Sequence, residues 1–458
     1  MNARFLSHRA RARWRCQRGS VLIIVLVICL GLVSLALVFG HGMMMSYRGA
    51  DNDLAGRQAE AAIRGAEQYA EAIVAQAAVA NTLPARSSYQ ANAVAVGEAK
   101  FWFVGVPLGS DPIDKPAFGL VDEASKLNLN SVGVDVLALM PDMTLDLAAA
   151  IRQWRTTQGT DPTAGGISFN TVKAGPFESP EELALVNGGT DPSVLYGDDA
   201  NLNHVIDPEE GGGNAGASPS PSGGSASGSG LPGLLEYVTT FSREPNVLSD
   251  GTRRGNVFGG ANAIQGALTT ALGSSRAEAI LQSGQVRGVR RFVSVVDFCQ
   301  RANLAPDEWD KITPYLTMGG GTYTVGLINA NTASATVLSC LPGMTPELAQ
   351  QLVSARPQPG DATASNLAWV VPILGANART IGRYLTTKSY QFSVDVAAVG
   401  RHGRGYRRTL FILDTSTDPS GRPQIVYRRN LTNLGWALGS DARNTLRDLA
   451  AKGGGSQP

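Results

Sequence analysis

Oxygen-bearing residues recur at alternate positions of one short loop, YGDDANLNHVIDPEE, which covers 196–210. Counted from Asp199, positions 1, 3, 5, 7, 9 and 12 of a twelve-residue loop are Asp199, Asn201, Asn203, Val205, Asp207 and Glu210. Alternating donors let a tight loop wrap a hard cation, with a backbone carbonyl from the seventh residue and two oxygens from the twelfth. This spacing is that of an EF-hand loop and predicts a structural calcium site.

His204 occupies the sixth position of the loop, where glycine is usual because the backbone turns sharply there. Histidine is among the residues that tolerate a left-handed backbone, so the substitution is compatible with a calcium loop. The alternative is a polar turn, rich in Asn and Asp, that opens the flexible linker GGGNAGASPSPSGGSASGSG at 211–230.

No catalytic constellation stands out in the 458 residues. The four histidines are scattered, which argues against a zinc site, and GGGT at 319–322 lacks the other residues of a phosphate-binding loop. The net charge of +1 includes six arginines before residue 19, so the remainder is mildly acidic and has no basic domain typical of nucleic-acid binding. The body holds only Cys299 and Cys340, which are either one disulfide or two buried thiols.

An apolar run from Val21 to Phe39 is long enough to span a bilayer. Arginines precede the run and none lies within it, which predicts a cytoplasmic amino terminus and an external body. The run is too long for the core of an ordinary secretory signal, and FGHGMMMSYRG is a poor cleavage site at its far end. An uncut signal anchor is the alternative. The alanine-rich segment that follows has apolar residues at helical spacing and predicts that the helix continues outside the membrane.

An internal repeat joins two distant segments of the chain. NLNSVGVDVLALMPDMTLDLAAAIRQWR at 128–155 aligns without a gap with NANTASATVLSCLPGMTPELAQQLVSAR at 329–356, and ten of the 28 positions are identical. Each copy predicts a short helix, a turn that contains proline, and a second helix. Helix-hairpin-helix motifs of this kind bind the phosphate backbone of DNA when basic residues flank the turn. Here Asp142 lies in one turn and no Lys or Arg follows closely, which favours packing or protein contact over DNA.

Five strand-like segments flank the helical part of the chain: 100–106, 117–123, 389–400, 406–414 and 423–430. Two precede and three follow that part, so we expect an α+β fold in which an antiparallel sheet is built from both ends of the chain. Arginines near the last strands alternate with apolar residues and are expected on a solvated sheet face: Arg401, Arg404, Arg407, Arg408, Arg428 and Arg429.

The amino terminus resembles a class III prepilin signal, with a basic leader that ends in Gly19, a small Ser20, about twenty apolar residues and a continuing helix. INANTASATVLSCLPGM at 328–344 resembles the signature of K-type minor pseudopilins of the bacterial type II secretion pathway. Most pilin-like proteins have a glutamate at the fifth mature position; this chain has Ile24, and the K type characteristically lacks that glutamate.

The resemblance implies a non-enzymatic protein that prepilin peptidase cuts between Gly19 and Ser20. It also implies a single-pass inner-membrane anchor, a periplasmic body, and a place at the pseudopilus tip with the I- and J-type minor pseudopilins and the major pseudopilin. No nucleic acid is expected. The alternatives are a membrane-anchored DNA-binding protein of a competence-type pilus and a calcium-dependent binding domain on an uncut anchor.

These inferences divide the chain into consecutive parts. We expect a leader at 1–19, a long pilin-type helix whose transmembrane part is 20–40, its periplasmic part and a connection at 41–99, the first sheet strands at 100–123, a large α-helical inserted domain with the hairpin repeats at 124–385, the last strands at 386–435 and a C-terminal tail at 436–458.

Overall fold

A computed structural model describes residues 20–78, 81–107, 115–156, 173–207, 210, 232–358, 361–418 and 420–453. The chain forms two compact units, Met1–Leu54 and Ala55–Pro458. The leader with Gly19, the linker at 211–230 and the last residues of the expected tail lie outside the described residues.

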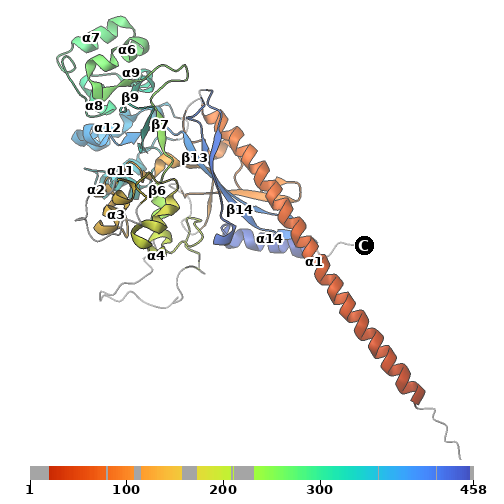
Figure 1. Cartoon of the computed structure of the whole chain (residues 1–458). Coiled ribbons are helices and arrows are strands. Elements are labelled where there is room, and N and C mark those ends of the chain that lie inside the picture. The colour runs from red at the N-terminus through yellow and green to blue at the C-terminus, as the bar shows by residue number, and fades with distance from the viewer. Residues whose placement is uncertain are drawn as a thin grey trace, which may run out of the picture. The chain divides into compact units, whose positions relative to one another are not determined.

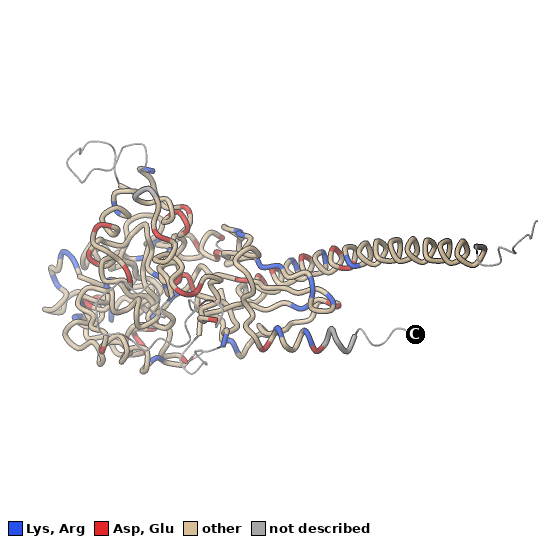
Figure 2. The backbone as a smooth tube through the Cα atoms, turned by 90° about the horizontal axis from the view of Figure 1, so that it is seen from below, with Lys and Arg blue, Asp and Glu red and all other residues tan. Residues whose placement is uncertain are grey.

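Helix α1 spans Ser20–Ala77. Its part from residue 20 to 47 carries no charged side chain, and Figure 2 shows this stretch of the tube without red or blue. Within the described residues it is the one helix long and apolar enough to cross a membrane. The expected long helix is therefore present in the described residues.

The second unit contains a seven-stranded antiparallel sheet with the order β1-β2-β13-β14-β15, β3 beside β2 and β4 beside β13. Figure 1 labels two of its neighbouring strands, β13 and β14. The strands of this sheet are β1 (Val94–Val96), β2 (Ala99–Gly105), β3 (Ala117–Phe118), β4 (Val121–Asp122), β13 (Gln391–Val399), β14 (Arg407–Asp414) and β15 (Gln424–Asn430). The sheet is built from both ends of the chain, which confirms the expected α+β architecture. The segment expected as one strand at 117–123 is two short strands.

The two faces of the sheet are covered by different helices. Small residues of α1 lie fully buried against one face, which lets the helix approach the strands closely: Ala59, Ala62, Ala66 and Ala70 pack against Phe101, Phe103, Phe392 and Val394. On the other face, Trp102 and Val399 pack against Leu446 of α14 (Gly439–Gly453). The segment expected as a tail is thus largely a helix that closes the second side of the sheet.

The helical insertion between β4 and β13 contains three modules of the same construction within the described residues. Each opens with a two-residue strand that ends in Asn and closes with a two-residue strand that ends in Thr. The two strands pair in parallel, and each Asn lies opposite its Thr: Asn128 and Thr239, Asn256 and Thr317, Asn329 and Thr386. The ungapped sequence repeat lies in the first and third of these modules.

The modules differ in their helices. The first comprises β5 (Leu127–Asn128), α2 (Val134–Leu137), α3 (Leu145–Thr156), η4 (Pro180–Gly188), α4 (Pro192–Tyr196), α5 (Leu234–Tyr237) and β6 (Val238–Thr239). The second comprises β8 (Gly255–Asn256), α6 (Ala261–Leu272), α7 (Ser274–Gln282), α8 (Val295–Arg301), α9 (Pro306–Ile312) and β9 (Leu316–Thr317). The third comprises β11 (Ile328–Asn329), α10 (Ala335–Ser339), α11 (Pro346–Ser354), η8 (Leu367–Val370), α12 (Val371–Leu374), α13 (Ala378–Ile381) and β12 (Leu385–Thr386).

Short elements complete the described structure. Strands β7 (Arg243–Pro245) and β10 (Tyr323–Val325) pair antiparallel between modules. Single 3-10 turns lie at η1 (Arg86–Ser88), η2 (Glu123–Ser125), η5 (Val257–Gly259), η6 (Thr313–Tyr315), η7 (Ala362–Ser365), η9 (Gly375–Asn377), η10 (Arg401–Gly403) and η11 (Thr432–Leu434).

The same side-chain hydrogen bonds recur in the modules. The Oδ1 atoms of Asn128, Asn256 and Asn329 each accept from the amide two residues later, at 2.9, 3.0 and 2.9 Å. The Oγ1 atoms of Thr239, Thr317 and Thr386 do the same at 3.0, 3.2 and 3.1 Å. The first asparagine of each pair in the sequence repeat, and Asn256 in the second module, therefore hold the backbone at the start of their modules, as expected of Asx turns.

The first and third modules also share an arginine that closes the helix pair. Arg155 donates to the carbonyls of Leu129 and Val132, and Arg356 donates to those of Ala330 and Ala333, which are the equivalent positions 201 residues later. Burial lowers the pKa of Arg356 to about 10. The closing arginine of each repeat is therefore a half-buried structural group that satisfies backbone carbonyls at the start of its module.

Cys299 and Cys340 are both fully buried and both free thiols, which decides between the two alternatives left by the sequence. They belong to the hydrophobic core that the three modules share. Burial raises the pKa of the Cys299 thiol, and it raises that of Cys340 to about 11.

Alkylation of the native protein is therefore expected to spare both thiols, because a buried protonated thiol is a poor nucleophile. Mapping by mass spectrometry after iodoacetamide treatment should find Cys299 and Cys340 labelled roughly 100-fold more slowly in the folded than in the urea-unfolded protein. Equal labelling before and after unfolding would contradict the burial seen here.

Candidate metal site

The predicted calcium loop interrupts the first module between α4 and α5. Its flanks meet: Gly197 and Pro232 form an isolated antiparallel bridge, and the amide of Gly233 donates to the carbonyl of Tyr196 at 3.1 Å. A Cβ at Gly233 would lie 2.2 Å from the carbonyl oxygen of Leu195, so only glycine fits there. In the second and third modules a helix leads to the closing strand with no such loop, so the first module alone carries it among the described residues.

Asp199 holds the beginning of the loop. Its side chain is buried, and its two carboxylate oxygens accept from the backbone amides of Asn203 at 3.1 Å and of His204 at 2.6 Å. Burial raises the pKa of this carboxyl group, and the nearby His204 and the two amides oppose that rise. A buried carboxylate that has lost its water is stabilised by a nearby cation.

His204 adopts the left-handed conformation expected at the sixth position, with φ of +65°. The histidine therefore fits the sharp turn that glycine usually makes there. Its Nδ1 atom lies 3.3 Å from Oε2 of Glu236 on α5. Asp199, His204 and Glu236 place possible ligand atoms within 4.8 Å of one another.

Glu236 was missed in the sequence because it lies 26 residues beyond Glu210, on the far side of the linker. The only local signal is one glutamate in an otherwise apolar helical turn, LLEY, which by itself indicates nothing about a metal.

The remaining oxygen-bearing residues converge on one another. Nδ2 of Asn201 and Nδ2 of Asn203 each donate to Oδ2 of Asp207 at 3.1 Å. Glu210 accepts from the amide of Asn201 at 3.0 Å and from that of Asp207 at 3.2 Å. The amide of Val205 donates to Oδ1 of Asn203 at 2.8 Å. The structure thus brings the six predicted positions into one hydrogen-bonded loop, although residues 208 and 209 lie outside its described part.

Two observations fit this loop to a hard cation. Oδ1 of Asn201 is buried and has no hydrogen-bond partner within the described structure, which is costly unless something else occupies its lone pairs. Burial also raises the pKa of Glu210, with its two backbone donors opposing the rise. An all-oxygen donor set with three carboxylates suits calcium rather than a softer metal.

Arg408 ties this loop to the sheet. The side chain, on β14, is fully buried, forms an ion pair with Asp395 of β13 and donates to the carbonyls of Asn201 and Leu202. The expectation that this arginine lies on a solvated sheet face is therefore wrong. The alternation along β14 places it on the face that the loop covers, which the strand sequence does not reveal.

The helix hairpins of the repeat are packing elements. Equivalent positions of the first and third modules are fully buried in the shared core: Leu137 and Leu338, Ala148 and Ala349, Ile151 and Leu352. Asp142 takes a left-handed conformation, with φ of +55°, where the third module has Gly343. Nothing in these turns favours DNA binding.

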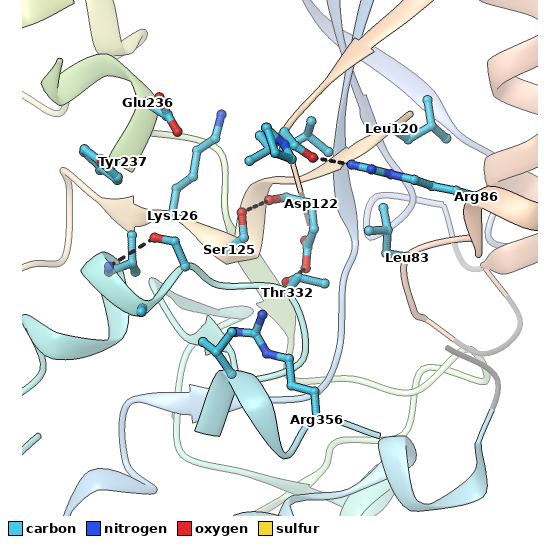
Figure 3. Close-up of a pocket in the computed structure, with 17 residues that line it drawn as sticks. Leu83, Arg86, Leu120, Asp122, Ser125, Lys126, Glu236, Tyr237, Thr332 and Arg356 are labelled. Carbon is cyan, nitrogen blue, oxygen red and sulfur yellow. Dashed lines mark hydrogen bonds between the residues drawn. The ribbon is translucent and has the colours of Figure 1, made fainter. Parts of the chain in front are cut away.

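A cavity of about 210 Å³ lies where the sheet meets the insertion (Figure 3). The charged residues around it are engaged in the fold. Asp122 accepts from the side chains of Asn329, Thr332 and Ser389 and from one backbone amide, and Lys126 contacts Glu123 at 3.1 Å. The cavity therefore lies at the joint between the sheet and the third module, where Asp122 of β4 is hydrogen-bonded to Asn329, Thr332 and Ser389.

Comparison with known proteins gives a family match and matches to solved structures. Residues 328–380 match the family described as type II secretion system (T2SS), protein K. This segment begins with INANTASATVLSCLPGM, the stretch that carried the resemblance. The chain is also similar to a chain in the crystal structure of the GspK-GspI-GspJ complex of the type 2 secretion system of enterotoxigenic Escherichia coli, with a TM-score of 0.41 and 10% identity, over 82% of this chain and 96% of that chain. No curated protein matches the chain.

Proposed function

We propose that the chain is a minor pseudopilin of the protein K type in the type II secretion system, and that it caps the pseudopilus tip and helps to start assembly. The observation that carries this proposal is the insertion of three helical modules between β4 and β13 of the pilin-like sheet. A subunit enlarged in this way would obstruct another subunit stacked on it. The role is structural, not catalytic.

Ile24 supports the same place in the filament. It lies in the apolar part of α1, at the fifth position counted from Ser20. A carboxylate within lipid is costly and is kept where it pairs with another group. Because Ile24 offers no carboxylate for the terminal amine of a neighbour, the subunit needs no partner at that position, which suits the end of a filament.

We propose that the partners are the I- and J-type minor pseudopilins, with the major pseudopilin below them. The solved relative was crystallised as a complex of GspK with GspI and GspJ. Co-purification of this chain with its own I- and J-type subunits checks the proposal. A chain that retains neither subunit in detergent would contradict it.

The protein is anchored in a membrane through α1. We propose that this is the bacterial inner membrane, with the leader in the cytoplasm and the body in the periplasm, because six arginines precede the apolar run and none lies within it. In this orientation prepilin peptidase would cut between Gly19 and Ser20.

Mass spectrometry of the mature amino terminus tests the proposal. In cells with prepilin peptidase the chain is expected to begin at Ser20, and in cells without it the leader should remain. A Gly19→Leu variant should stay uncut in both, because a bulky residue replaces the small residue at the cleavage site. A wild-type chain that begins at Met1 in both strains would overturn the pilin-type processing.

We propose that the loop binds one structural calcium ion through the side chains of Asp199, Asn201, Asn203, Asp207 and Glu210 and the carbonyl of Val205. The ion would neutralise buried carboxylates and fix the loop inside the first module. The unpartnered, buried Oδ1 of Asn201 is the observation that supports it.

A further inference from the structure

Arg408 is a buried cation that donates hydrogen bonds to two parts of the molecule, strand β13 and the candidate calcium loop. Its Nε lies 3.0 and 3.1 Å from the two carboxylate oxygens of Asp395, and its Nη2 lies 2.6 Å from one of them. Its Nη1 donates to the carbonyl of Asn201, and Nη2 also donates to that of Leu202 at 2.7 Å. Every nitrogen of the guanidinium group therefore has an acceptor, shared between strand β13 and the loop.

This arrangement requires arginine. The planar guanidinium group of arginine can donate to a carboxylate on one side and to two carbonyls on another. The ammonium group of lysine is a single point of charge and cannot form the same set of hydrogen bonds. A buried cation is tolerated only when it is paired and hydrogen-bonded, and Asp395 supplies the opposite charge. Because the pair is neutral as a whole, its effect on a nearby cation depends on the geometry it imposes more than on its charge.

The two carbonyls belong to the third and fourth positions of the loop. Asn201 carries one of the proposed ligands, and the next residue, Leu202, takes a left-handed conformation with φ of +54°. This costs free energy in a residue other than glycine. By holding the carbonyls on each side of the turn, Arg408 fixes the backbone that places Asn201 and Asn203 beside Asp199.

We propose that Arg408 is a positioning residue for the calcium loop, which it holds in its binding shape and couples to the pilin-like sheet. This inference rests on the proposed calcium site. Arg408 lies more than 200 positions away from Asn201 and Leu202 of the loop in the sequence, and by this inference it contributes to the affinity for calcium. By linkage, calcium in turn strengthens the attachment of the loop to β13 and β14.

Calcium titration of the full-length protein in detergent micelles by isothermal calorimetry tests this inference. Arg408→Lys keeps the charge and loses the planar guanidinium group, and it is expected to raise the dissociation constant for calcium about tenfold, as loss of groups that orient metal ligands commonly does. Arg428→Lys, on the exposed part of β15, is the matched control and should bind as the wild type does.

Asp395→Asn provides a second variant, should Arg408→Lys fold poorly. This substitution keeps the guanidinium group of Arg408 but removes the carboxylate charge that pairs with it. It should also raise the dissociation constant for calcium. A purely structural arginine would lower the unfolding temperature of the metal-free protein and leave calcium affinity unchanged. Wild-type affinity in Arg408→Lys would therefore overturn the inference while the calcium site stands. No heat of binding in the wild type would instead overturn the calcium site.

Discussion

Adding calcium to the wild-type protein is expected to raise its free energy of unfolding by about 2.7 kcal/mol when calcium is at 100 times its dissociation constant, because the ion binds only the folded loop. Loops of this type in extracellular modules have dissociation constants of about 0.1–1 mM, so calcium at about 10–100 mM gives this 100-fold excess. For a unit of this size the gain corresponds to a rise of about 3 °C in unfolding temperature. Thermal unfolding followed by circular dichroism measures it.

Asp199→Ala is expected to abolish the gain, since it removes the first ligand and the acceptor that holds two loop amides. The neighbouring Asp198→Ala is the matched control, because it removes the same charge one residue outside the ligand positions. Magnesium at the same concentration controls for ionic strength. An equal response to calcium in Asp199→Ala and Asp198→Ala would show that the loop is a polar turn.

The sequence predicted the parts of the fold whose signals are local. Alternation along 389–400 and 406–414 predicted β13 and β14, and both are present. The helix α14 was missed, although Leu438, Ala442 and Leu446 recur at helical spacing and pack on the sheet. The polar residues between them, and their place at the end of the chain, made a tail the simpler interpretation.

The ungapped sequence repeat does not extend to the second module, because its residues differ from LPGM at the turn between α8 and α9. That turn nevertheless places Asn303 in the left-handed conformation that Asp142 and Gly343 adopt in the other modules. The second module also shares the parallel pair of Asn256 and Thr317 with their two local hydrogen bonds. Two residues in each strand carry too little information for an alignment. The module is recognised from the parallel pairing of β8 with β9, in which Asn256 lies opposite Thr317, 61 residues later.

The proposed metal site likewise combines local and tertiary signals. Its six candidate ligand positions lie within twelve consecutive residues and were predicted from their spacing, and His204 has the left-handed conformation that this prediction requires. Glu236 and Arg408 reach the loop only through the tertiary fold, so no spacing rule could assign them. Arg408 was even expected in solvent, because a strand pattern does not tell which face a later insertion will cover.

Asp122 joins the sheet to the insertion, and its loss is expected to be among the most damaging single changes. The side chain is fully buried on β4, and it accepts from three side chains of the third module and its connection: Asn329 at 2.9 Å, Thr332 at 2.7 Å and Ser389 at 2.6 Å. Figure 3 shows Asp122 and Thr332 facing each other across the joint. All of these groups donate, so Thr332 and Ser389 would lose this acceptor, and Asn329 would keep only the hydroxyl oxygen of Ser389.

Asp122→Ala is therefore expected to lower the free energy of unfolding by about 3 kcal/mol, the sum of a small cavity and several buried donors left unpaired. Urea unfolding of the full-length protein in detergent micelles measures this loss. Asp135→Ala, an exposed acid on α2, should change the same quantity by less than about 0.5 kcal/mol. Equal effects of the two substitutions would show that the joint does not depend on Asp122.

The pH dependence gives an independent test of the same residue. Burial raises the pKa of Asp122 above that of the unfolded chain, although four hydrogen bonds oppose the rise. In the folded state Asp122 therefore keeps its proton to a higher pH than in the unfolded state. The free energy of unfolding consequently falls as the pH rises from about 4, near the unfolded pKa, through the folded pKa. Asp122→Asn cannot ionise and should lack that decline, so its stability relative to the wild type should improve between about pH 4 and pH 7. Parallel stability curves for the two proteins would mean that Asp122 titrates alike in the folded and unfolded states, and that its burial is offset in full by the hydrogen bonds it accepts.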